Sequence, residues 1–124
     1  MSIDVIVPAS AKKTYDNWHF APAVRSENLV FFSGVIGNGD TPEAEFRNAW
    51  ESLFITLKEA GLGFEDIIDT TLYIVGLQAH AATMAKVKDE FIKAPYPAST
   101  WIGVSELIHP NARAEIKVIA RIPT

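Results

Sequence analysis

Two stretches of the chain carry apolar residues at steps of three and four, the spacing that places them on one face of an α-helix. The first begins after Thr41, which suits the N-cap, and Pro42, which suits the first helical position. It ends before Gly61, a residue that often closes a helix in the left-handed conformation. The second runs from about residue 78 to residue 92. The predicted buried stripes are Phe46, Ala49, Trp50, Leu53, Leu57 and Ala60 in the first helix, and Leu77, Ala81, Met84, Val87 and Phe91 in the second.

Runs rich in β-branched and aromatic residues predict strands in the rest of the chain. The clearest run, from Leu29 to Ile36, is apolar on both of its faces, which indicates burial on both sides. Pro22 indicates an edge position or a break in the preceding strand, because proline cannot donate to a ladder. The other predicted strands span residues 3–7, 18–25, 67–75, 96–104 and 114–121, and a polar segment through residue 17 separates the first two.

The order β-β-β-α-β-α-β-β predicts a single α+β domain over residues 1–124, with a mixed sheet and two helices packed on one face. Two helices cover only one face of so wide a sheet. The other face then exposes Leu29, Phe31 and Val35, or the residues that alternate with them. Because large apolar patches on soluble proteins usually mark interfaces, we expect the chain to associate with copies of itself.

The composition narrows the possible partners. The net charge is −4 and no basic run is longer than Lys12-Lys13, which disfavours nucleic acid. The absence of cysteine excludes disulfides and thiol nucleophiles. No apolar run is long enough to cross a bilayer, and the amino-terminal residues lack the apolar core of a signal peptide. We therefore expect a cytoplasmic protein without a membrane partner. The three histidines lack metal-ligand spacing, so we expect no metal.

Glu115 is the main candidate for chemistry, because it is the one carboxylate inside the otherwise apolar strand 114–121. A carboxylate in a sheet is costly unless it is paired or faces a wet cleft. One interpretation is structural, with Glu115 paired to Arg113 or to Lys117, which shares its strand face. The other interpretation places Glu115 in a ligand cleft. Ser33, which precedes Gly34, is likewise either a packing residue or a pocket residue.

The chain resembles the RidA/YjgF family of imine and enamine deaminases over nearly its whole length. Its closing residues 116–123 are most similar to the YjgH-like branch. The order and spacing of several segments together carry the resemblance. They are Ala23-Val24-Arg25 through Val30-Phe31-Phe32-Ser33-Gly34, Ala60-Gly61-Leu62 with Asp66-Ile67-Ile68-Asp69-Thr70-Thr71, Tyr96-Pro97-Ala98, and Glu115-Ile116-Lys117-Val118-Ile119-Ala120.

The resemblance implies a chorismate-mutase-like fold and a homotrimer with small-molecule clefts between subunits. It also implies hydrolysis of 2-imino or 2-enamino acids to 2-keto acids and ammonia, without metal or organic cofactor. In such proteins an arginine after the Pro-Ala pair grips the substrate carboxylate. A glutamate on the last strand handles the attacking water, and a tyrosine helps to orient it.

These roles carry over to this sequence in part. The glutamate position is Glu115, and the pocket serine is Ser33, next to Gly34. The tyrosine position is Phe20, which keeps the ring and loses the hydroxyl, and an asparagine that lines the family's pocket is Met84 here.

The arginine position is Ser99, followed by Thr100 and Trp101. A serine cannot replace a bidentate guanidinium. Hydrogen bonds to charged groups contribute roughly 1.5–3 kcal/mol each, so the loss costs on the order of 10²-fold in binding unless another cation substitutes. The candidates are Arg25, Arg113 and Lys117.

We therefore expect weakened or absent 2-imino acid deaminase activity, and a cleft rebuilt for a smaller, neutral or aromatic-leaning ligand with Phe20 and Trp101 in its wall. Glu115 favours a hydrolytic enzyme. Ser99 and Phe20 favour a non-catalytic metabolite-binding or protein-interaction trimer on the same scaffold. RNA cleavage, which has been attached to parts of the family, is the least favoured because the chain is acidic.

Overall fold

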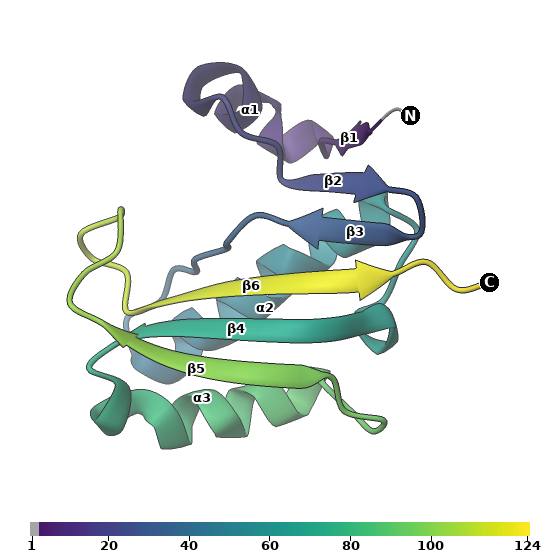
Figure 1. Ribbon diagram of the computed structural model, residues 1–124. Coiled ribbons are helices and arrows are strands. Elements are labelled where there is room, and N and C mark those ends of the chain that lie inside the picture. Colours follow the sequence, from purple (N-terminus) through teal and green to yellow (C-terminus); the bar gives the residue numbers. More distant parts are fainter. Residues whose placement is uncertain (1–2) are drawn as a thin grey trace.

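The fold is built on one six-stranded mixed sheet, seen in a computed structural model that describes residues 3–124 (Figure 1). The strand order is β1-β2-β3-β6-β4-β5, and every neighbouring pair is antiparallel except β4 and β5, which are parallel. The strands are β1 (Asp4–Ile6), β2 (Ala23–Ser26), β3 (Leu29–Phe32), β4 (Ile67–Val75), β5 (Ala98–Val104) and β6 (Ala114–Arg121). The α-helices are α1 (Lys12–Trp18), α2 (Pro42–Glu59) and α3 (Leu77–Phe91), with 3₁₀ turns at Ala9–Ala11 and Phe64–Asp66.

The two long helices cover one face of the sheet, as the sequence predicts (Figure 1). The hydroxyl of Thr41 caps α2 by accepting a hydrogen bond from the amide of Ala44 at 3.1 Å. Gly61 follows α2 with φ +76°, the left-handed conformation that glycine adopts without strain. The centre of the layer between sheet and helices is fully buried and contains Trp50, Leu53 and Leu57 of α2, Met84 and Val87 of α3, and Leu72, Ile74, Ile116 and Val118 of the sheet.

Neither α2 nor α3 lies on the opposite face of the sheet, which we call the open face. Side chains along β6 alternate between the two faces: Ile116 and Val118 are buried, while Glu115 and Lys117 are partly exposed. Phe31 on β3 is 40% exposed, so the expected burial of this strand on both sides does not occur within one chain. The sequence prediction that an apolar face remains uncovered is confirmed at this residue.

β3 is shorter than its apolar sequence suggests, because a bulge interrupts its ladder with β6. The strands pair at Phe31–Ile119 and again at the isolated bridge Val35–Ile116. Between these two pairs, the three residues 32–34 lie opposite the two residues 117 and 118 of β6. Bulges of this kind often re-aim side chains beside functional sites. Here the bulge lies at Ser33 and Gly34, next to Glu115.

The sequence interpretation missed α1, which it treated as a polar segment followed by a strand from residue 18. The helix buries none of its residues, so it has no apolar stripe from which it could be detected. An ion pair between Lys12 and Asp16 at 2.9 Å spans one of its turns. His19 ends the helix in the left-handed conformation with φ 60°, and β2 begins only at Ala23.

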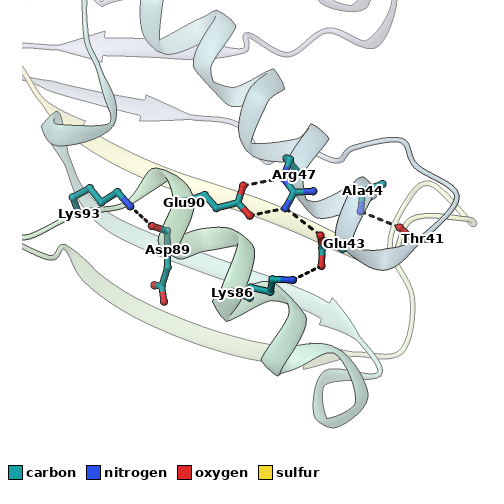
Figure 2. Close-up of polar contacts among 8 residues, drawn as sticks. All are labelled: Thr41, Glu43, Ala44, Arg47, Lys86, Asp89, Glu90 and Lys93. Carbon is teal, nitrogen blue, oxygen red and sulfur yellow. Dashed lines mark hydrogen bonds and ion pairs between the residues drawn. The ribbon is translucent and has the colours of Figure 1, made fainter.

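A network of charged side chains joins the exposed surfaces of α2 and α3 (Figure 2). Arg47 donates to both carboxylate oxygens of Glu90 across the helix pair and to Glu43 one turn away at 3.2 Å. Lys86 contacts the other oxygen of Glu43 at 2.9 Å. Hydrogen bonds from Arg47 lower the pKa of Glu90, and those from Lys86 and then Arg47 lower the pKa of Glu43 from 4.5. The same network raises the pKa of Arg47.

Replacing Arg47 with glutamine should cost a small amount of stability that depends on pH. A carboxyl whose folded-state pKa is depressed stabilises the fold above its unfolded pKa, and this contribution is lost as pH falls through the folded pKa. The difference between wild type and Arg47→Gln in urea unfolding should therefore be present at neutral pH and vanish well below pH 4.5. Lys13→Gln, which removes an exposed cation with no ion pair within residues 3–124, serves as the control. An Arg47→Gln deficit that persists in acid would contradict this account.

No helix within the described residues 3–124 is long and apolar enough to cross a membrane.

Candidate functional site

Glu115 lies on the open face of the sheet, near the beginning of β6. Its cross-strand partner on β4 is Tyr73, so the two side chains are neighbours on the same face. The adjacent residues Ala114 and Ile116 point to the core and are almost fully buried. This alternation fixes the direction of Glu115, because a shift of register by one residue would move Ile116 out of the core.

The start of β6 is anchored by a buried ion pair. Glu45 of α2 is 3% exposed and accepts hydrogen bonds from the backbone amide and the guanidinium of Arg113, each at 2.7 Å. Arg113 immediately precedes β6 and lies two residues before Glu115. The pair therefore joins the helix layer to the strand that carries Glu115.

Gly34 provides the space that the Glu115 side chain occupies. A Cβ atom at position 34 would lie 2.0 Å from Oε2, 2.6 Å from Cδ and 2.8 Å from Cγ of Glu115. These distances are far below van der Waals contact, so glycine is the only residue type that fits while Glu115 keeps its position. The bulge that follows β3 thus places the backbone of Gly34, which has no side chain, against the carboxylate of Glu115.

Glu115 makes no hydrogen bond or ion pair with other residues of the described range 3–124. The pairing with Arg113 or Lys117 that the sequence allows does not occur. Arg113 is bound to Glu45, and the side chain of Lys117 is directed at the carbonyl oxygen of Phe32 at 3.4 Å. Glu115 is therefore a half-buried carboxylate whose oxygens remain available to a ligand or to water.

Two hollows meet at Glu115 and Gly34, which line both. The first, the lysine hollow, has a volume of about 460 Å³ and is lined also by Ser33, Tyr73 and Lys117. The second, the tryptophan hollow, has a volume of about 530 Å³ and is bordered also by Thr14, Trp18, Phe20, Ile36, Ile108, His109 and Pro110.

Of the three cations considered as substitutes for an arginine, only Lys117 borders the lysine or the tryptophan hollow. Arg25 donates to the carbonyl oxygen of Glu27 at 2.9 Å on the exposed β2–β3 turn. Arg113 is held by Glu45. Lys117 shares the lysine hollow with Glu115, so the two opposite charges face the same space.

The structure brings together four of the residues that the sequence singles out. Glu115, Ser33 and Gly34 share the lysine hollow, and Phe20 lies in the tryptophan hollow. The hydroxyl of Ser33 donates to the carbonyl oxygen of Ala21 at 2.6 Å, which fixes the bulge.

Met84 is fully buried in the core between α3 and the sheet, so its assignment to the pocket is wrong.

Ser99, Thr100 and Trp101 border neither of these hollows in the same chain. They lie on β5, at the edge of the sheet, and β4 separates that strand from β6. Trp101 pairs with Leu72 and packs against the core on the helix side, so within one chain it does not form a wall with Phe20. Ser99 and Thr100 are exposed.

Sequence reasoning missed Tyr73, Trp18 and Ile108 as site residues. Tyr73 was detectable in principle, because the alternation of the strand 67–75 places it on the face opposite Leu72 and Ile74. Trp18 and Ile108 come from α1 and from the loop between β5 and β6, and no periodic pattern relates those segments to Glu115. In the described residues 3–124, no three or more His, Asp or Glu side chains are grouped to hold a metal ion.

Comparison with known proteins identifies the family. The family model described as Endoribonuclease L-PSP matches residues 12–122. The chain belongs to the YjgF/RidA family. It is 38% identical to the RutC family protein YjgH of Escherichia coli strain K12, over 95% of this chain and 94% of that protein.

A second relative and a solved structure extend the comparison. A protein of Dermatophagoides farinae named 2-iminobutanoate/2-iminopropanoate deaminase is 31% identical, over 83% of this chain and 85% of that protein. A solved structure described as protein YJGH superposes with a TM-score of 0.89 at 33% identity and covers 100% of this chain and 99% of that chain. The α+β architecture of this chain is therefore that of YjgF-family structures.

Proposed function

We propose that the protein is a cytoplasmic homotrimer that hydrolyses the C=N bond of small imines, or of enamines after tautomerisation, in clefts between subunits. The observation that carries this proposal is the Glu115 carboxylate, which is half-buried, has no partner within residues 3–124 and lies where two hollows meet. A carboxylate in this setting suits a general base. The relative named as an imine deaminase supports the same chemistry.

In the proposed reaction Glu115 accepts a proton from a water molecule as the water oxygen bonds to the imine carbon. The electron pair of the C=N π bond moves to nitrogen, which takes up a proton. Protonation of the resulting carbinolamine nitrogen and loss of a proton from its hydroxyl then break the C–N bond, releasing ammonia and the carbonyl product. Tyr73, the cross-strand neighbour of Glu115 in the lysine hollow, takes the place of the hydroxyl that Phe20 lacks and orients the water.

The open face of the sheet supports the trimer. It exposes Phe31, and neither α2 nor α3 covers it. Packing copies around this face would bury it and bring the exposed Ser99 and Thr100 of one β5 edge toward a neighbour's hollow. Light scattering should give the mass of three 13.6-kDa chains, and a monomer at micromolar concentration would contradict the intersubunit cleft.

We assign Lys117 the contact with the substrate carboxylate. The lysine ammonium is a point charge and does not form the two parallel hydrogen bonds of an arginine guanidinium, so it binds a carboxylate more weakly than an arginine does. Lys117→Met should raise the KM for 2-iminopropanoate about tenfold, because a hydrogen bond to a charged group is worth roughly 1.5–3 kcal/mol, and it should leave kcat within about threefold. Initial rates of keto-acid release over a range of imine concentrations measure both constants.

Arg25→Met is the matched control, because Arg25 is an exposed cation on the β2–β3 turn that borders neither the lysine nor the tryptophan hollow. It should leave KM and kcat unchanged. If Lys117→Met and Arg25→Met behave alike, Lys117 does not contact the carboxylate.

The proposed function is tested with 2-iminopropanoate that an amino-acid oxidase generates in the assay from alanine. Semicarbazide traps the imine, so an enzyme that hydrolyses it first lowers semicarbazone formation and releases pyruvate. We expect a rate above that in buffer but modest, because Ser99 replaces the carboxylate-gripping arginine. Equal rates with and without the protein, for this imine and for bulkier ones, would exclude the proposed activity.

A second candidate is a non-catalytic trimer that binds a metabolite in the same hollows. Ser99 and Phe20 favour it, because they lack the guanidinium and the hydroxyl on which the family's deaminase chemistry depends. Calorimetry with keto acids separates the two candidates: binding without any acceleration of imine hydrolysis would support this second function. The net charge of −4 gives no electrostatic support to RNA cleavage.

A further inference from the structure

The tryptophan hollow is surrounded by large apolar side chains that water can reach. Trp18 is 69% exposed, Phe20 is 42% exposed and Ile108 is 86% exposed. Single exposed apolar residues are common on protein surfaces, but several around one concavity usually mark a binding site. The volume of about 530 Å³ falls in the range of small-molecule pockets.

These side chains come from segments that lie outside the strands of the sheet. Trp18 is the last residue of α1, and Phe20 follows the left-handed turn at His19. Ile108 and Pro110 belong to the loop between β5 and β6, which projects beyond the beginning of β6 toward the side of the sheet where α1 lies (Figure 1). The helix and the loop thus form two apolar walls of one hollow.

The hollow is continuous with the carboxylate to which we assign the chemistry. Glu115 and Gly34 line both the tryptophan hollow and the lysine hollow. A molecule whose reacting carbon lies at Glu115 therefore has two directions in which to extend. Toward Lys117 it meets a cation, and toward Trp18 and Phe20 it meets aromatic rings.

We infer that the site selects imines with a bulky apolar substituent, best an aromatic ring, which lies in the tryptophan hollow between Trp18, Phe20 and Ile108. This inference rests on the proposed function, because it takes the position of the imine carbon from Glu115. An aromatic ring buries a large area and stacks on other rings at a small cost in conformational entropy. A methyl group in the same position would leave most of the hollow filled with water.

The experiment compares two substrates that differ only in this group. An amino-acid oxidase generates 2-imino-3-phenylpropanoate from phenylalanine and 2-iminopropanoate from alanine, and semicarbazide competition gives kcat/KM for each. We expect the phenyl substrate to be preferred by tenfold or more, since even one methylene in an apolar pocket is worth about 10–200-fold. Trp18→Ala and Ile108→Ala should each reduce this preference about tenfold, chiefly by lowering kcat/KM for the phenyl substrate.

Ile55→Ala is the matched control, because Ile55 on α2 is 52% exposed and lies outside both hollows. It should leave the preference unchanged. If the apolar walls instead serve as a contact between copies of the chain, Trp18→Ala will change the oligomeric mass in light scattering and lower both rates equally. That outcome would overturn the inference.

Binding of the keto-acid products separates failure of this inference from failure of the proposed function. Calorimetry should show phenylpyruvate binding at least tenfold more tightly than pyruvate, with the difference lost in Trp18→Ala. If neither imine is hydrolysed but this difference in binding is present, the catalytic function fails and the apolar subsite stands. If both imines are hydrolysed at equal efficiency and both keto acids bind equally, the catalytic function stands and the apolar subsite is wrong.

Discussion

Glu115→Gln should lower kcat/KM for imine hydrolysis by about 10²–10⁴-fold, the usual contribution of a general acid–base group. Glutamine has nearly the same shape, so it preserves the contact with Gly34, but its amide cannot accept a proton from water. The fold should not suffer, because within residues 3–124 the carboxylate has no hydrogen bond or ion pair to lose. Thermal unfolding of the variant should occur at the same temperature as wild type or above it.

Glu106→Gln is the control for this substitution. Glu106 is an exposed carboxylate in the loop between β5 and β6 and lines neither the lysine nor the tryptophan hollow. Its replacement makes the same change in net charge, so any effect of charge alone appears in both variants. We expect Glu106→Gln to retain wild-type activity. Retention of activity in Glu115→Gln would mean that Glu115 is not the base.

Gly34→Ala should reduce kcat/KM about 10²-fold, because displacing a catalytic group by about 1 Å can cost that much. The new Cβ would overlap the Oε2, Cδ and Cγ atoms of Glu115, so the carboxylate must move. Gly34 does not have a positive φ, so alanine brings no backbone strain. The effect should appear in activity far more than in the unfolding temperature.

Gly103→Ala is the matched control, because its Cβ would meet only the side chain of Leu77, at 3.3 Å and 3.6 Å. A double variant gives the sharper test. If Gly34→Ala acts through the position of Glu115, adding it to Glu115→Gln should cost little further activity, whereas independent effects would multiply. Multiplicative losses would show that Gly34 matters for another reason.

Most of the fold follows from patterns that are local in the sequence. The helix with Trp50 and Leu53 and the one with Met84 and Val87 were predictable, because each presents an apolar stripe that must be buried. The break after Phe32 was not predictable, because apolar residues continue through Ile36 and the bulge depends on pairing with β6.

The candidate site was predictable only in part, for a physical reason. Glu115 stands out because a carboxylate interrupts an apolar strand, a signal that one segment carries alone. Trp18 and Ile108 belong to segments that meet Glu115 only in the folded chain. Ser99, by contrast, was placed by resemblance, and within one chain it lies at a sheet edge that is separated from β6 by β4. Only a neighbouring subunit can bring it to the site.

A crystal structure of the protein with phenylpyruvate tests the central claim most directly, because the keto acid keeps the carboxylate, the ring and a trigonal carbon where the imine would have one. We predict a trimer in which that carbon lies beside Glu115, the carboxylate contacts Lys117, and the ring packs against Trp18 and Phe20. A lysine or arginine from a neighbouring subunit bound to Glu115, with the ligand excluded from both hollows, would contradict the account.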